Sequence, residues 1–212
     1  MKKIIALLII IASVLALCAC DNGSDEPNPG DTLERMLSAR YNTATTVTLT
    51  APDGTVLNHS YTLEVADNGE RTCSYYAEYL NVIDEGALTL PPESRICAYS
   101  GSVTTDASGN VIAATGDEHP YLNVATLTSP TFNVKGGTVM GITDNGDTIT
   151  GNVMNVSLFL GINNQINTNA RLSVKYSGDS ARELKLDFSM PGGVYADMNQ
   201  ITVTVQFAER IG

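Results

Sequence analysis

The chain has 212 residues, with 23 acidic and 12 basic side chains, and its formal net charge is −11. Nucleic acids and anionic lipid surfaces bind to extended basic patches, so this acidic balance argues against both as electrostatic partners. Its length predicts one domain, and the absence of tryptophan leaves tyrosine and phenylalanine as the aromatic residues that can form a ligand platform.

The N-terminal segment has the pattern of a secretory signal peptide. It has a basic start, followed over residues 4–17 by a run that is apolar except for one serine. This run is shorter than the roughly 20 residues that a membrane-spanning helix needs, so we predict a cleaved signal over residues 1–19. The ending Leu17-Cys18-Ala19-Cys20 resembles the lipobox of bacterial lipoproteins. The resemblance implies that Cys20 is lipidated and that its acyl chains hold the protein on a membrane. An ordinary signal peptide with a cysteine at the cut is the alternative.

Residues 20–31 are polar and proline-containing, which predicts a disordered tether. Ser24-Asp25-Glu26 resembles the acidic export signal that sends some Gram-negative lipoproteins to the cell surface. We therefore expect a lipid-anchored protein of the outer membrane, and we favour the surface over the periplasmic face. A plain solvated linker is the alternative for the acidic cluster.

A short helix is predicted after the tether. Asp31 and Glu34 have the spacing of a capping box, and apolar residues follow at helical spacing. We expect this helix over residues 32–41, covering one end or edge of the domain.

From residue 44 onward, apolar and polar residues alternate with period two, and turn sequences recur at short intervals. The turns are predicted at 52–54, 67–69, 106–110, 144–147, 178–179 and 191–193. Turns between alternating segments predict hairpins, and about ten strands of this kind predict an all-β fold, an antiparallel β-sandwich or barrel-like domain over residues 32–212. The residues expected to point inward are Leu49, Leu63, Val65, Leu172, Val174, Leu186, Phe188, Val203, Val205 and Phe207.

Residues 117–131 interrupt the alternation. They form either a long crossover loop or a boundary between two β lobes. We favour the crossover loop, because neither half of the chain alone would bury a large core.

Two cysteines, Cys73 and Cys97, lie in strand-like segments after the signal and the anchor. An exported compartment permits a disulfide between them. Two buried free thiols are the alternative, since cysteine packs as a small hydrophobic residue.

Residues that could support catalysis are few. His59 lies within a strand pattern and His119 in the long loop, and neither has a metal-ligand partner at the usual spacing. No nucleophile-elbow motif occurs, so the sequence predicts no catalytic residue, no metal site and no cofactor.

A recognition surface is predicted at two places. Tyr76 and Glu78 share one face of a strand, while His119 and Tyr121 lie in the long loop. The alternative is that the tyrosines of this region belong to the core.

Three short motifs resemble the Asp-(Ser/Thr)-apolar acceptor for protein O-glycosylation in some gut anaerobes. Their acceptor residues are Thr32, Thr148 and Ser180. All three fall in predicted turns or at the starts of elements, where we expect an enzyme to reach them.

Together, these features are similar to those of β-rich outer-envelope lipoproteins of gut Gram-negatives. We expect a non-enzymatic, lipid-anchored protein that binds a glycan, a small ligand or another envelope protein. Two alternatives are a calycin-like carrier of an apolar ligand and an envelope hydrolase using His119 or paired carboxylates in the long loop. A ligand-sized cavity in the β domain would favour ligand binding, and a filled core would favour a structural role.

Overall fold

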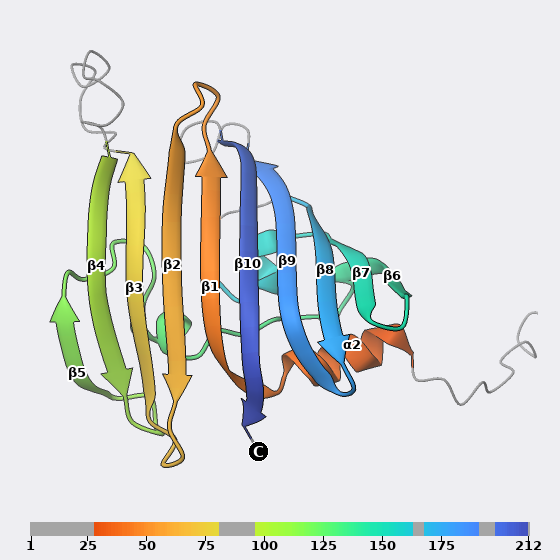
Figure 1. The fold of residues 1–212 in the computed structure, drawn as a ribbon, viewed down its shortest axis with the longest axis horizontal. Helices are drawn as coiled ribbons and strands as arrows, with labels where there is room; N and C mark the ends of the chain where they lie inside the picture. The colour runs from red at the N-terminus through yellow and green to blue at the C-terminus, as the bar shows by residue number, and fades with distance from the viewer. Residues whose placement is uncertain (1–27, 81–95, 163–167, 191–197, 212) are drawn as a thin grey trace, which may run out of the picture.

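The computed structural model describes residues 28–80, 96–162, 168–190 and 198–211. Its strands form one ten-stranded sheet in the order β5-β4-β3-β2-β1-β10-β9-β8-β7-β6 (Figure 1). The strands are β1 (Arg40–Thr50), β2 (Val56–Val65), β3 (Arg71–Leu80), β4 (Ile96–Thr105), β5 (Val111–Gly116), β6 (Val139–Asp144), β7 (Thr148–Val153), β8 (Ala170–Ser177), β9 (Ser180–Met190) and β10 (Met198–Ile211). The helices are α2 (Pro29–Leu37), α3 (Val124–Thr128) and α4 (Val156–Phe159).

The all-β prediction is confirmed. Every neighbouring pair of strands is antiparallel. Of the two predicted architectures, the structure has the barrel-like one, a single curved sheet whose edge strands are β5 and β6. The predicted turns between residues 52 and 179 each join two strands that are adjacent in the sheet, and the turn predicted at 191–193 lies outside the described residues.

Helix α2 begins and ends earlier than predicted. The side chain of Asn28, not Asp31, caps it by accepting a hydrogen bond from the Gly30 N–H at 2.9 Å. Pro29 is in the first turn, where its fixed φ favours a helix start. The helix ends at Leu37, and Arg40 already belongs to β1, so the prediction that residues 38–41 are helical is wrong. Because α2 begins at Pro29, it also starts within the segment predicted to be a disordered tether.

The two faces of the sheet have different surroundings. In Figure 1 the helices lie behind the sheet, together with the segment that connects β5 to β6, and none of the described helices lies on the face toward the viewer. Alternation along β1 follows this arrangement: Leu49 points to the covered inner face and is 8% exposed, whereas Thr46 and Thr48 are exposed on the outer face. The segment at 117–138 thus crosses from one edge of a single sheet to the other, as the crossover-loop interpretation predicted.

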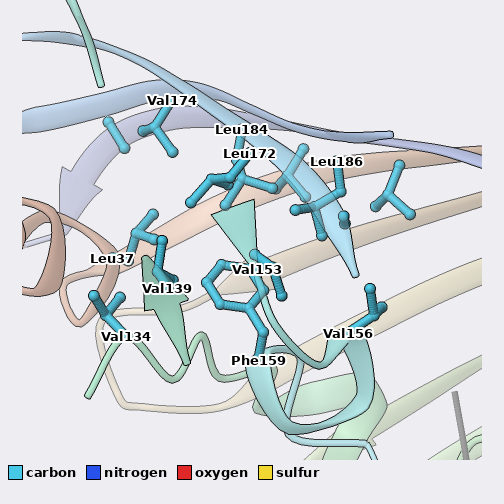
Figure 2. Packing of buried hydrophobic residues seen from close by; sticks show 14 of the residues in the cluster. Leu37, Val134, Val139, Val153, Val156, Phe159, Leu172, Val174, Leu184 and Leu186 are labelled. Atoms are coloured by element: carbon cyan, nitrogen blue, oxygen red, sulfur yellow. The ribbon is translucent and has the colours of Figure 1, made fainter. Parts of the chain in front are cut away.

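The main core lies between the inner face and helices α2 and α4. Figure 2 shows Phe159 of α4 among Val153, Leu172 and Leu186. Phe159 is fully buried, and a second, smaller cluster forms under β2, β3 and β4. Eight of the ten predicted core residues are buried, and the other two, Val65 and Phe188, are half-buried.

Candidate functional site

A cavity of about 240 Å³ separates part of the inner face from the crossover segment. Protein interiors usually contain few voids larger than a water molecule, so a cavity of this size needs explanation. Its wall is mainly aliphatic and aromatic. The apolar and aromatic lining residues include Val47, Leu49, Leu57, Leu63, Tyr79, Tyr121, Leu122, Leu127, Phe132, Leu160, Phe188, Met190, Ile201, Val203 and Val205. The polar lining residues are Thr43, Thr45, His59, Tyr61, Glu78, Thr126 and Thr131.

The strand register aligns the cavity floor in rows. Leu49 pairs with Leu57 on one side and with Ile201 on the other. In the next row, Val47 pairs with His59 and Val203. Toward the start of β1, Thr43 pairs with Leu63 and Phe207, so a short side chain lies between two larger ones. This difference leaves space above β1.

The crossover forms the roof. Phe132 packs against Phe159 and Phe207, with ring centroids 5.8 Å and 6.1 Å apart, so the far part of the roof is fixed to the core. Nearer β3, the ring of Tyr121 lies 4.7 Å from that of Tyr79. These contacts hold residues 121–132 over the sheet and keep the space below them open.

At the β2–β3 side of the cavity, hydrogen bonds join His119 of the roof to Tyr61 of the floor. Nδ1 of His119 accepts the backbone N–H groups of Tyr121 and Leu122, at 3.2 Å and 2.9 Å. Because Nδ1 is an acceptor, the ring proton of neutral His119 is on Nε2. Nε2 therefore donates toward the hydroxyl of Tyr61 at 3.2 Å, and the hydroxyl of Tyr79 lies 3.4 Å from the same nitrogen.

The same reasoning fixes the protons on His59. Its Nε2 lies 2.7 Å from the backbone carbonyl of Glu78, which can only accept, so Nε2 carries the proton. Nδ1 of His59 is left to accept the hydroxyl of Tyr61 at 3.3 Å. The resulting chain of donors runs from His119 through Tyr61 to His59 and ends on the Glu78 carbonyl.

Both histidines are held neutral. Burial lowers the pKa of His119 to about 4, and the neighbouring His59 adds to that effect. Burial also lowers the pKa of His59, although the carbonyl and the charge of Glu78 act in the opposite direction. Two neutral rings can share one hydroxyl, whereas two imidazolium rings would repel each other.

This network positions the roof and does not provide a hydrolytic pair. Within the described residues, the ring nitrogens of both histidines contact tyrosine hydroxyls or backbone groups, and no serine hydroxyl or carboxylate is within hydrogen-bonding distance of them. The described segments also contain no group of three His, Cys, Asp or Glu residues placed to hold a metal ion.

The four residues of the predicted recognition surface do not form one surface. Tyr76 is 40% exposed on the outer face, where its hydroxyl donates to Oε1 of Glu78 at 2.7 Å. His119 and Tyr121 lie on the inner side, the first 6% and the second 50% exposed. The two pairs face opposite ways, because Tyr76 alternates along β3 with the inward-pointing Tyr75 and Ala77.

Most residues that line the cavity were not predicted as site residues from the sequence, and Thr43, Thr45 and Phe132 are examples. One signal was present in β1: Thr43 and Thr45 are in phase with the inward Val47 and Leu49, so short polar residues occupy positions where a filled core has large apolar ones.

The two cysteines do not form the disulfide that the sequence permitted. Both are free, although their strands, β3 and β4, are adjacent. Cys73 pairs with Val103, whereas Cys97 pairs with Tyr79. This offset along the strands corresponds to about 20 Å, far beyond the 4.4–6.8 Å between Cα atoms of a disulfide.

The predicted O-glycosylation acceptors differ in access. Thr32 is only 8% exposed in the first turn of α2, so the expectation that an enzyme could reach it is wrong. Helix formation turns this side chain toward the sheet. Thr148 and Ser180 are half-buried at the starts of β7 and β9, and their modification stays a prediction.

In the part of the chain that the structure describes, we find no helix with both the length and the apolar character that crossing a bilayer requires. No protein-family model and no curated protein matches the sequence. Among solved structures, a LolA superfamily protein from Nitrosomonas europaea is similar, with a TM-score of 0.31 and 9% identity over 87% of this chain and 93% of that one. Similarity at this level says nothing about function, so the function of this chain has to be inferred from its own residues.

Proposed function

We propose that this protein is a non-enzymatic binding protein that holds a small apolar ligand in the cavity beneath the sheet. We further propose that lipid on Cys20 keeps it at the outer membrane. The first proposal is carried by the apolar cavity of about 240 Å³, and the second by the resemblance of Leu17-Cys18-Ala19-Cys20 to a lipobox. Of the roles considered from the sequence, the carrier of an apolar ligand fits such a cavity best.

The size and wall of the cavity support this function. Small-molecule pockets usually measure roughly 300–1,000 Å³ and are mainly apolar, with a few polar groups. The cavity here is somewhat smaller, which favours a slender ligand. Of its polar side chains, His59 and Tyr61 bond to each other and the carboxylate of Glu78 accepts from Tyr76. Burial of apolar surface would therefore supply most of the binding free energy.

A matched pair of variants tests the proposal. The Cys20→Ala chain without its signal peptide, which has no lipid, is titrated with the neutral fluorescent probe N-phenyl-1-naphthylamine. Val47→Phe adds a ring to the cavity floor, whereas Thr48→Phe adds the same ring one residue away on the exposed outer face. We expect Val47→Phe to weaken probe binding at least tenfold, roughly 1.4 kcal/mol, and Thr48→Phe to leave it unchanged.

Thermal unfolding of both variants confirms that they are folded at the assay temperature. Equal probe binding by the Val47→Phe variant and the parent chain would show that the cavity is not the binding site.

A further inference from the structure

Next to the cavity lies a second, more open hollow of about 440 Å³, between the start of β1, the β2–β3 end of the sheet and residues 128–135. The two hollows share the lining residues Thr43, Leu63, Pro130, Thr131 and Phe132. The second hollow therefore adjoins the cavity, with residues 130–132 between them, and we call it the mouth.

The mouth is positively charged on an acidic protein. Three of the chain's 12 basic residues line it, namely Arg40, Arg71 and Lys135, whereas among the described residues one of the 23 acidic side chains does, Glu34. Lys135 is paired with that carboxylate at 2.7 Å. Because these two charges offset each other, Arg40 and Arg71 give the mouth its positive charge.

Within the part of the chain that the structure describes, both guanidinium groups keep donors that no partner occupies. Among the described residues, Arg71 makes one side-chain hydrogen bond, from Nη1 to the hydroxyl of Ser129 at 2.9 Å, and Arg40 makes none. A guanidinium has five N–H donors in a planar fork that suits carboxylate and phosphate oxygens. At this mouth, such donors line a space that adjoins the apolar cavity.

From these observations we infer that the ligand is an anionic single-chain amphiphile, with its charged head at Arg40 and Arg71 and its chain in the cavity. The inference rests on the proposed function, because it names the class of ligand for the same cavity. Strand β2 gives the orientation: Val65, which pairs with Arg71, lines the mouth, whereas Leu57 lies at the other end of the cavity floor. The distance between these two residues along the strand is about 27 Å, room for an extended chain.

Competition against N-phenyl-1-naphthylamine tests the inference with three ligands of equal chain length. Laurate has a carboxylate, dodecyl phosphate has a phosphate, and dodecanol is neutral. The two anions are used below their micelle concentrations and dodecanol below its solubility limit, all on the Cys20→Ala chain without its signal peptide. We expect at least one anion to bind about tenfold more tightly than dodecanol, since a hydrogen bond to a charged group has about this effect. The stronger of the two anions identifies the head group.

Variants of the mouth locate the head group. Arg71→Gln and Arg40→Gln should each weaken binding of the preferred anion severalfold and leave dodecanol binding unchanged, and Arg71→Lys should restore part of the loss. Arg182→Gln is the matched control, because Arg182 is exposed on β9 and lines neither hollow. Raising the salt concentration to about 1 M should weaken only the anions.

If the probe binds but the anions and dodecanol compete equally in every variant, the inference is wrong and the proposed apolar site stands. If, in addition, the Val47→Phe variant binds the probe as tightly as the parent chain, both the inference and the proposed function are wrong.

Discussion

The hydroxyl of Tyr61 lies 3.2 Å from Nε2 of His119, a residue 58 positions later in the chain. This contact joins the floor of the cavity to its roof. The hydroxyl also lies 3.3 Å from Nδ1 of His59, so it accepts from one ring and donates to the other. The arrangement requires both rings to be neutral, which makes the roof sensitive to acid.

Acidification should destabilise the protein through His119. The folded state holds the pKa of this ring at about 4, below its ordinary value of 6.5, so the unfolded chain binds the proton first. The contribution of His119 to the free energy of unfolding is therefore complete above pH 6.5 and is lost as the pH falls toward 4. After allowance for solvent screening, the free energy of unfolding should decrease by about 2 kcal/mol.

Urea unfolding at several pH values measures this loss in the parent chain and in His119→Gln. Carboxylates with lowered pKa values, such as that of Glu183, also destabilise the fold in acid, so the difference between the two proteins is the relevant quantity. The variant should be less stable at pH 7 and have the shallower pH dependence between 6.5 and 4. Parallel curves would show that His119 does not titrate as proposed.

The thiol of Cys73 should be unreactive in the folded protein. It is 1% exposed, and burial raises its pKa to about 11, so almost no thiolate is present at neutral pH. We expect an aromatic disulfide reagent to titrate two thiols in urea, for Cys73 and Cys97, in the Cys20→Ala chain once its signal peptide is removed. Without urea, the reaction of Cys73 should be slow and limited by opening of the fold.

A Cys73→Ser variant identifies the slow thiol. Detection of no free thiol in urea without reductant would instead indicate a disulfide, contrary to the free cysteines of the structure.

Two phenylalanines should differ in their effect on stability. Phe207 is 7% exposed and packs against Tyr41, with ring centroids 5.0 Å apart, so Phe207→Ala should cost about 3–5 kcal/mol of unfolding free energy. Phe188 is half-buried and lines the cavity. Phe188→Ala should therefore cost less than Phe207→Ala and should alter probe binding.

Denaturant unfolding gives both free energies, and the probe titration gives the binding constants. An equal loss of stability in the two variants would indicate that Phe188 belongs to a filled core.

Changing Cys20 to alanine should release the protein from membranes, because the lipobox resemblance makes Cys20 the acceptor of the acyl chains. Fractionation of cells and the intact mass of the protein measure this effect. Retention of the variant in the membrane fraction, together with an unacylated wild-type mass, would contradict a lipid anchor.

The sequence by itself determined the strands, their hairpin turns and the all-β class, because these depend on near neighbours: alternation selects the buried face, and Asp-Gly or Asn-Gly turns join consecutive strands. It also predicted eight of the buried core residues correctly, since burial follows the same alternation. The helix boundaries were less well predicted, because Asn28 and Asp31 are both good capping residues and Pro29 favours the earlier start.

The cavity and its mouth were decided only by the tertiary structure. Pairing of β1 with β10 joins the two ends of the described domain, and the crossover brings His119 onto Tyr61. The offset between Cys73 and Cys97 and the opposite faces of Tyr76 and Tyr121 likewise depend on register and chain path. These relations join residues that are far apart in sequence, and local periodicity carries no information about which distant segments will meet.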